Sequence, residues 1–342
     1  MMDLLARKVG RVGHITFNRP AALNALSHPM SLTLESALDD WREDEEVQLI
    51  LIDAEGPRAF CAGGDIAAVY HAGKAGDYSV GRDFWRDEYR MNAKIAEYRK
   101  PVVALMQGFV MGGGVGVGGH ASHRVVGETT QIAMPESGIG LIPDVGGSLV
   151  LGRAPGHVGE YLGVTGARIG AADAIYAGFA DAFVPEADWP ALKGRLIETA
   201  DPAQINRTPA PDARLPGLQA EIDAAFSAPT LAEIVARLTA SGTAFAADCL
   251  KAIARNSPLS MAATIDLVRG ARKLASIRDA LDNEFRFTWR ACETGDFLEG
   301  VRAQIIDKDR QPRWRHAGIE ALDAAEVARM LEPLGREAAI WE

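Results

Sequence analysis

The chain contains little that would mark a secreted protein. Its 342 residues include only three cysteines, Cys61, Cys249 and Cys292, which are widely spaced and odd in number. Such a sparse set of thiols argues against a disulfide framework and favours a reducing compartment. The first ten residues lack the apolar core of a signal peptide, and a strand-like run at residues 14–17 follows almost at once. A cytoplasmic location is therefore expected.

Basic residues are fewer than acidic ones. The chain has 36 Lys and Arg residues against 46 Asp and Glu residues, a formal net charge of −10 at pH 7, and the basic residues form no stripe. A nucleic-acid partner is therefore not expected. The hydrophobic share of 48% and the charged share of 24% are close to those of soluble globular proteins, which excludes extensive disorder.

One uncharged stretch is long enough to be mistaken for a membrane span. Residues 101–122 contain no Asp, Glu, Lys or Arg, and about twenty such residues can cross a bilayer. Seven glycines interrupt the stretch, however, and glycine is a poor residue inside a continuous helix. We expect a buried strand, a turn and the start of a helix here, and no membrane partner.

Apolar runs that resemble β-strands alternate with helix-like segments in the first part of the chain. The strand-like runs lie at residues 14–17, 48–53, 101–106, 124–126 and 131–134, and the helix-like segments lie at 32–41 and 82–98. This alternation predicts an α/β fold. After residue 202, Pro209, Pro211 and Pro216 indicate a linker, and helical patterns follow at 231–238, 245–254, 257–272 and 277–291. We expect an α/β core at 1–201, and a linker and a C-terminal α-helical region at 202–342.

Two glycine-rich turns could direct backbone N–H groups at one point. The first, residues 60–66, contains Gly64, and the second, residues 111–116, contains Gly113. Two N–H groups that converge on a carbonyl oxygen form an oxyanion hole, which stabilises the negative charge that develops on a thioester under attack. The alternative is that these glycines serve only tight turns and close packing.

Two carboxylates eight residues apart, Glu136 and Asp144, lie among apolar and glycine residues. A carboxylate in a dry pocket has a shifted pKa and can act as a base, an acid or a nucleophile. The alternative is that the two acids are helix N-caps or solvated loop residues.

Other catalytic patterns are weaker. Residues 114–119 match G-x-G-x-x-G, but a dinucleotide site also needs an acidic residue about twenty positions further on, and the next strand ends too early, near Glu128. His120 and His123 have no evident third metal ligand, so no metal is expected. Cys61 has no basic neighbour in sequence and fits a small buried residue better than a nucleophile. The nucleophile elbow G-x-S-x-G is absent.

Several motifs occur together in a characteristic order: Asn18-Arg19-Pro20 with 23–26, 60–65, 111–114, Pro135-Glu136 with 143–147, and 296–303 with 307–309 and 312–314. In this order and spacing the chain resembles the crotonase superfamily over nearly its whole length. The resemblance implies that residues 1–201 form a spiral of ββα units in two roughly perpendicular sheets, which carries a CoA-ester site, and that helices follow. It also implies that the amides of Gly64 and Gly113 polarise the thioester carbonyl, with Asp65 among the substrate-binding residues.

Three positions favour a hydrolase within this superfamily. The position that would hold the first glutamate of a hydratase is Gly116, while Glu136 matches the second. Asp144 stands where hydratases commonly have glycine, and Glu88 begins a Glu-Tyr-x-x-Asn segment. Both features resemble the 3-hydroxyisobutyryl-CoA hydrolases. That resemblance implies that Glu88, Gly113, Glu136 and Asp144 bind the substrate, and that Glu136 and Asp144 are catalytic.

The expected function is hydrolysis of 3-hydroxyisobutyryl-CoA, or of a close short 3-hydroxyacyl-CoA, as in valine catabolism. Glu136 would either attack the thioester or activate a water. CoA is part of the substrate, so no separate cofactor is expected. One alternative is an enoyl-CoA hydratase or isomerase that uses Glu136 alone, and another is a non-catalytic CoA-binding protein. Superfamily members often form trimers, so a homo-oligomer is a further expectation, although the helical extension could cover that surface.

Overall fold

The computed structural model describes residues 2–211 and 213–341. The chain divides into two compact units whose segments alternate in sequence. Unit 1 comprises Met1–Asp65, Asp87–Ala133 and Arg168–Arg214, and unit 2 comprises Ile66–Arg86, Met134–Ala167 and Leu215–Glu342. This organisation differs from the expected division between residues 201 and 202, because residues 66–86 and 134–167 group with the C-terminal helices.

Unit 1 contains two β-sheets. The larger sheet has the order β1 (Leu4–Val9), β2 (Val12–Phe17), β3 (Leu49–Ala54), β5 (Val102–Met106), β7 (His123–Val126), β9 (Ala182–Phe183), and the smaller sheet has the order β4 (Ala59–Cys61), β6 (Phe109–Met111), β8 (Gln131–Ala133). Only β1 and β2 pair antiparallel among these strands, and the other neighbours are parallel.

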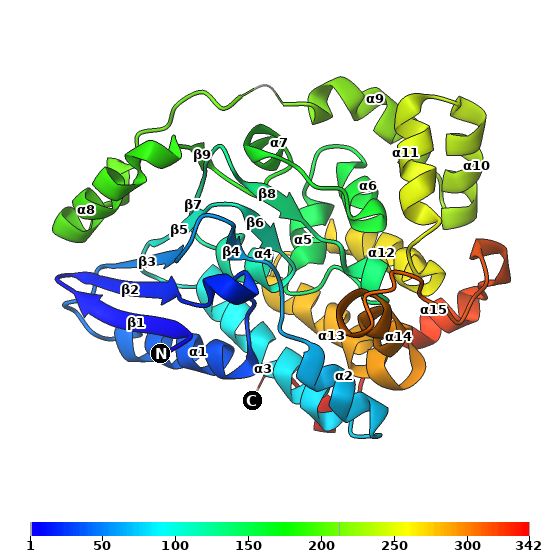
Figure 1. Ribbon diagram of the computed structural model, residues 1–342, viewed down its shortest axis with the longest axis horizontal. Helices are drawn as coiled ribbons and strands as arrows, with labels where there is room; N and C mark the ends of the chain where they lie inside the picture. Colours follow the sequence, from blue (N-terminus) through cyan, green and yellow to red (C-terminus); the bar gives the residue numbers. More distant parts are fainter. Residues whose placement is uncertain (1, 212, 342) are drawn as a thin grey trace. The chain divides into compact units, whose positions relative to one another are not determined.

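From β3 onward, successive strands alternate between the two sheets (Figure 1). Each pair of strands is followed by helix in the chain: α2 (Ala67–Lys74) and α3 (Ser79–Ala96) after β4, α4 (Gly113–Gly118) after β6, and the short 3-10 helix η2 (Glu136–Ile139) and α5 (Gly147–Gly152) after β8. This succession is a spiral of ββα units, so the expected fold class is confirmed. The uncharged stretch 101–122 forms β5, β6 and α4, as its glycines indicated, and no helix among the described residues is long and apolar enough to cross a membrane.

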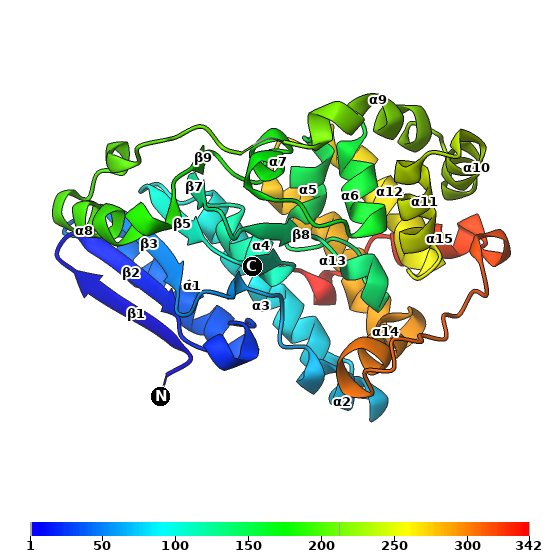
Figure 2. The same ribbon diagram turned by 45° about the horizontal axis from the view of Figure 1, so that its top comes forward.

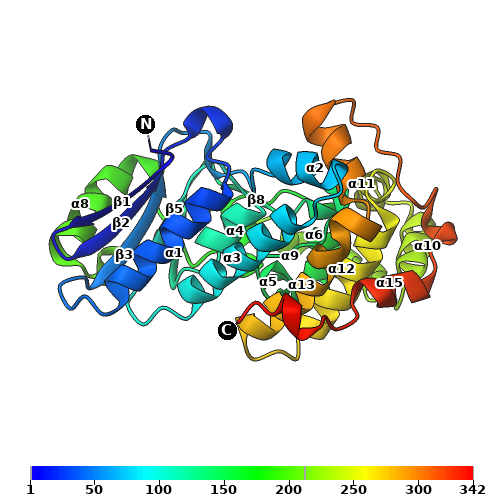
Figure 3. The same ribbon diagram turned by 90° about the horizontal axis from the view of Figure 1, so that it is seen from below.

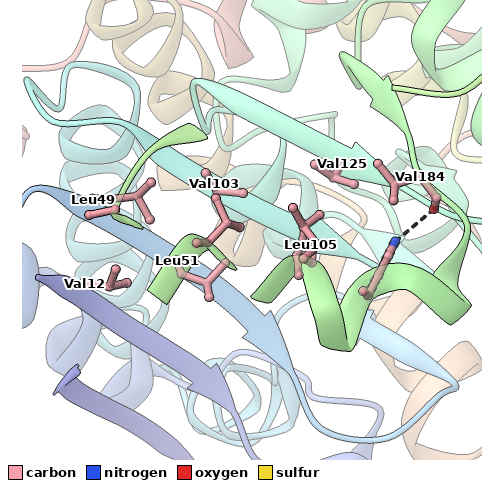
Figure 4. Packing of buried hydrophobic residues seen from close by; sticks show 11 residues of the cluster. Val12, Leu49, Leu51, Val103, Leu105, Val125 and Val184 are labelled. Atoms are coloured by element: carbon pink, nitrogen blue, oxygen red, sulfur yellow. Dashed lines mark hydrogen bonds between the residues drawn. The ribbon is translucent and has the colours of Figure 1, made fainter. Parts of the chain in front are cut away.

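The larger sheet is covered on one face by α8 (Trp189–Thr199). Valine and leucine side chains from β2, β3, β5 and β7 form a row under this helix (Figure 4). Trp189 joins the row, and its indole N–H donates to the carbonyl oxygen of Val184 at 2.9 Å, which ties the start of α8 to the chain just after β9. Such continuous apolar strands are typical of parallel sheets, which are buried on both faces.

The opposite face of the same sheet receives α1 (His28–Arg42). Side chains alternate between faces along a strand, so Gly13 in β2 points away from the α8 side. A Cβ atom at Gly13 would meet the indole ring of Trp41, which shows how closely α1 approaches the sheet. Figure 3 shows α1 and α8 on opposite faces of this sheet. The larger sheet is thereby packed against a helix on each face.

Unit 2 is mainly helical. Beside α2 and α5 it contains α6 (Val158–Thr165), α9 (Leu215–Phe226), α10 (Leu231–Ser241), α11 (Ala244–Ile253), α12 (Pro258–Ala271), α13 (Ile277–Thr294), α14 (Phe297–Val301) and α15 (Ala324–Met330), while α7 (Ala171–Tyr176) belongs to unit 1. The helices α10 and α11 lie side by side (Figure 2). Each is capped by a threonine, because the Thr230 and Thr243 hydroxyls accept hydrogen bonds from the first turns.

The helices α5 and α6 pack against α12, which explains why residues 134–167 group with the C-terminal part. Glu160 of α6 is fully buried, and its carboxylate pairs with Arg269 at 3.2 Å and with Arg272 at 2.7 Å. His157 also lies 2.9 Å from this carboxylate. A buried carboxylate is tolerated when it is paired in this way, so removal of one partner would be costly.

Candidate active site

The first glycine turn is fixed by backbone hydrogen bonds to residues 23–26. The Leu26 amide donates to the Gly63 carbonyl at 2.9 Å, and the Asp65 amide donates to the Leu26 carbonyl at 2.8 Å. Gly63 has a φ of +115°, which side chains rarely allow. The turn after β4 therefore has a defined shape, with the Gly64 amide between two residues that are anchored to Leu26.

The second turn places Gly113 beside Gly64. Gly113 is the first residue of α4, and a Cβ atom built on it would lie 3.6 Å from the Gly64 amide nitrogen and 2.7 Å from the Glu88 Oε1 atom. Within the described part of the chain, neither the Gly64 nor the Gly113 amide donates a backbone hydrogen bond. Unit 1 thus brings Gly64, Gly113 and Glu88 together, and two N–H groups side by side are what an oxyanion hole needs.

Glu88 is held by the helix that carries it. Its side chain is 3% exposed. One residue earlier, Asp87 lies 2.6 Å from the His28 ring in α1 and 2.5 Å from Arg90, and Lys94 pairs with Glu35 at 2.9 Å. The contacts of Asp87 with His28 and of Lys94 with Glu35 join α1 to residues 87–96 and keep the buried face of α3 turned inward, so the Glu88 carboxylate reaches the Gly113 turn.

Asp65 has a different environment. Its carboxylate accepts a hydrogen bond from Arg19 at 3.1 Å, and the same guanidinium donates to the Ala25 carbonyl oxygen at 2.9 Å. The partly exposed Asp65 side chain therefore connects the 60–66 turn to the motif at 18–25. A substrate contact by Asp65 stays a prediction.

The two predicted catalytic acids lie in unit 2, on the segment between β8 and α5. Glu136 is 5% exposed and begins η2, and its carbonyl oxygen accepts from the Leu141 amide at 3.0 Å. Ser137, the next residue, donates to the Gly163 carbonyl and accepts from the Ser257 amide, at 3.1 and 2.9 Å. These bonds attach the Glu136 turn to α6 and to the start of α12. Glu136 is thus a buried residue at the start of a short helix and not a solvated loop acid.

Asp144 is 4% exposed and lies in a tight turn before α5. Its carbonyl oxygen accepts from the Gly147 amide at 2.7 Å. The next two residues, Val145 and Gly146, have φ values of +55° and +78°. A positive φ is rare for a β-branched residue and persists only where surrounding contacts enforce it.

One residue that contacts this turn was not predicted from the sequence. Glu284 of α13 accepts hydrogen bonds from the amides of Gly146 and Ser148, at 2.7 and 2.9 Å, and from the Ser148 hydroxyl. Its signal in the sequence is a glutamate at helical spacing from Leu281 and Thr288, on the buried and mostly apolar face of α13.

The weaker patterns have structural explanations. Burial raises the pKa of Cys61 to about 12, so its thiol is a poor nucleophile. In the G-x-G-x-x-G stretch, a Cβ atom on Gly118 would lie 3.0 Å from the Phe60 ring, and one on Gly114 would meet the Cys61 carbonyl. These two glycines therefore serve close packing of α4. Among the described residues, no group of three or more His, Cys, Asp or Glu side chains is arranged to hold a metal ion.

Comparison with known proteins decides the family. The model of the enoyl-CoA hydratase/isomerase family matches residues 12–331. The chain belongs to this family. A 3-hydroxyisobutyryl-CoA hydrolase, mitochondrial, from Gallus gallus is similar to the chain, with 41% identity over 97% of the chain and 89% of the relative.

Two solved structures are similar to the chain over nearly their whole length. One, described as an enoyl-CoA hydratase from Rhodobacter sphaeroides 2.4.1, is 58% identical, covers 100% of both chains and has a TM-score of 0.97. The other, described as a carnitinyl-CoA dehydratase from Mycobacterium thermoresistibile, is 40% identical, covers 99% of this chain and 98% of that chain, and has a TM-score of 0.95.

The family relatives also correct one expectation. Vertebrate relatives, among them those of Gallus gallus and Xenopus tropicalis, are named mitochondrial. The expectation of a cytoplasmic protein, which was based on cysteine content and on the first residues, is contradicted by these names and is not retained. Cysteine content could not distinguish the two compartments, because it indicates only reducing conditions.

Proposed function

We propose that this protein hydrolyses the thioester of 3-hydroxyisobutyryl-CoA, or of a close short 3-hydroxyacyl-CoA, to the free acid and CoA, as a step of valine catabolism. The observation that carries the proposal is the pair of buried acids Glu136 and Asp144, on the segment between β8 and α5. Gly116, in buried α4, offers no side chain where a hydratase would need its first glutamate. Asp144 supplies the second carboxylate instead. The names of the curated relatives support the same reaction.

In the proposed reaction the amides of Gly64 and Gly113 bind the thioester oxygen and stabilise its developing negative charge. If Glu136 acts as a nucleophile, its carboxylate forms a bond to the carbonyl carbon, the carbon–sulfur bond breaks, and the CoA thiolate leaves and takes up a proton. Water then cleaves the resulting anhydride and regenerates the carboxylate. If Glu136 acts as a base, it removes a proton from a water that attacks directly. Asp144 orients the attacking group or water on either route.

No separate cofactor takes part in either route, since CoA arrives as part of the substrate and leaves as a product. The surroundings of Gly113 also suit a substrate with a polar acyl group. The Glu88 carboxylate lies beside Gly113 and could accept a hydrogen bond from a hydroxyl of the substrate. A homo-oligomer remains a separate expectation.

A hydratase or isomerase that uses Glu136 alone is the second candidate. It is favoured by the description of the 58% identical Rhodobacter structure as an enoyl-CoA hydratase. The two candidates differ in the bond that changes, because hydrolysis releases a thiol, whereas hydration removes the absorbance of a conjugated double bond and leaves the thioester intact.

The test compares these two signals in one preparation. Free CoA is measured with a thiol reagent on 3-hydroxyisobutyryl-CoA, and ultraviolet absorbance is followed on crotonyl-CoA. The proposal requires fast thiol release and a hydration rate at least about 100-fold lower. Fast hydration without thiol release would replace it with the second candidate. Inactivity in both assays, with CoA-ester binding retained, would favour a binding protein.

A further inference from the structure

The fully buried carboxylate of Glu284 accepts three hydrogen bonds from the turn that follows Asp144. It is 0% exposed. Its three hydrogen bonds come from residues 146 and 148, the same turn that carries Asp144. All three bonds therefore hold this turn in place.

Burial of such a group is expensive unless it is well bonded. Desolvation raises the pKa of Glu284 to about 8, the Ser148 and Gly146 hydrogen bonds oppose that rise, and the nearby negative charge of Asp144 adds to it. The carboxyl group thus exchanges its proton near neutral pH. The Ser148 hydroxyl can follow this change, because it donates to the carboxylate and can accept from the protonated acid.

These bonds maintain an unusual backbone conformation in the turn at residues 144–148. Val145 has the strained φ of +55°, and Gly147 donates back to the Asp144 carbonyl. Glu284 binds the two amides on either side of Gly147, so it clamps the turn just after Asp144. Without these acceptors, two amides at the start of α5 would be buried and unsatisfied, and Val145 could relax to a negative φ.

We propose that Glu284 is a positioning residue: by bridging the amides of Gly146 and Ser148 it maintains the strained 144–148 turn and thereby directs the Asp144 carboxylate into the reaction. This role rests on the proposed function of Asp144 as a catalytic acid. Glu284 itself touches no reacting atom in this assignment. Rotation of Asp144 by a relaxed turn would misplace its carboxylate by about 1 Å or more, which is enough to remove much of its catalytic effect.

The test begins with Glu284→Gln, which keeps the size of the side chain. Its NH2 group must face one of the two amides, so a donor meets a donor and the bridge is broken. We expect kcat for thiol release to fall at least about tenfold, with KM within about threefold, because the loss acts on positioning and not on binding. The matched control is Ser148→Ala, which removes only the hydroxyl contact and leaves both amide bonds, and it should change kcat less than about threefold.

A double-mutant cycle separates positioning from general destabilisation. In an Asp144→Asn background, Glu284→Gln should lower kcat by less than about twofold, because its effect passes through Asp144. A tenfold loss in both backgrounds would overturn the inference in favour of a structural role. Full activity of Glu284→Gln in an otherwise wild-type enzyme would overturn it as well.

A crystal structure of Glu284→Gln gives a readout that does not depend on activity. The inference requires that Val145 leave its positive φ and that the Asp144 carboxylate move. An unchanged turn would refute the inference, whether or not the wild-type enzyme releases thiol. A wild-type enzyme that releases no thiol would instead refute the proposed function. The two failures are therefore distinguishable.

Discussion

At the scale of single residues, Gly64, Gly113 and Glu88 lie together in unit 1, and their roles in substrate binding stay predictions. The glycine turns were recognisable because a close approach of backbone to ligand requires glycine. Glu284 was missed because the residues that it binds lie 136 and 138 positions away, and no local pattern encodes a contact at that separation.

Glu136→Gln is expected to lower thiol release at least about 100-fold while CoA-ester binding and folding persist. An amide has nearly the same shape as the carboxylate but is neither a nucleophile nor a base. Steady-state kinetics with a thiol reagent, together with the Kd for the CoA ester and the melting temperature, measure the three properties. Most of the wild-type turnover in this variant would remove Glu136 from the mechanism.

Gly113→Ala is expected to lower kcat/KM about ten- to hundredfold. The new Cβ atom would lie 2.7 Å from the Glu88 Oε1 atom, so the buried carboxylate must move and the Gly113 amide would shift with it. Gly194→Ala in α8 is the matched control, because no atom lies within 4 Å of its added Cβ. That variant should keep its activity, and its free energy of unfolding should rise by up to about 1 kcal/mol. Equal activity of the two variants would contradict the assigned oxyanion hole.

The raised pKa of Glu284 predicts a pH dependence of stability. Between its ordinary value of 4.5 and about 8, the folded protein holds a proton that the unfolded chain has released. The contribution of Glu284 to the unfolding free energy is therefore complete below pH 4.5 and is lost as the pH rises through about 8. Relative to Glu284→Gln, the wild-type protein should lose stability from about pH 5 to about pH 9 in urea titrations. A difference between the two proteins that is constant with pH would show that Glu284 ionises normally.

At the scale of elements, most of the expected segments appear, including the short strands β7 and β8 at the expected runs 124–126 and 131–134, but two other short strands were not expected. The expected strands at 48–53 and 101–106 appear as β3 and β5, and the expected helix at 277–291 appears as α13. The strands β4 and β6 have three residues each, too few to show an alternating pattern. Their place is determined by pairing within the smaller sheet, where β6 lies between β4 and β8. Pro216, expected in the linker, lies in the first turn of α9, where its missing N–H is harmless.

The start of α12 gives a prediction at this scale. Ser257 caps the helix by accepting from the Ser260 amide, and it donates to the buried Asp296 carboxylate at 2.6 Å. Ser257→Ala removes both bonds, so we expect the unfolding free energy to fall by about 2–3 kcal/mol. Thr230→Ala in α10 removes an exposed cap and a hydrogen bond to the exposed Glu233 carboxylate, with no buried partner, and should cost only about 1 kcal/mol. Similar losses in the two variants would show that the bond to Asp296 contributes little.

At the scale of the whole molecule, the two units are interleaved along the chain. The sequence suggested a boundary near residue 201 because composition changes there, but composition does not reveal which segments pack together. Trp85 and Phe297 illustrate the point: they are far apart in sequence, and their rings meet edge to face with centroids 5.3 Å apart. A side chain on Gly73 would likewise collide with Leu298.

This interleaving predicts that residues 1–201 do not fold alone. Without α12, the helices α5 and α6 would expose buried residues such as Leu151, Val158 and Leu162, and the Glu160 carboxylate would lose both arginines. The unpaired charge and the exposed apolar surface would give an aggregating or loosely packed fragment. Circular dichroism, thermal melting and size-exclusion chromatography of the fragment test this expectation.

A control separates loss of partners from damage by cutting the chain. Residues 1–209 and 210–342, produced together, contain every segment of both units and break only the connection between the 3-10 helix that ends at Gln204 and α9. Because such surface breaks are often tolerated, we expect the two pieces to assemble and to release thiol from 3-hydroxyisobutyryl-CoA at a rate within about tenfold of the intact chain. A cooperative melting transition for residues 1–201 alone would instead mean that this part is an independent domain, and that residues 66–86 and 134–167 can bury their apolar side chains without the C-terminal helices.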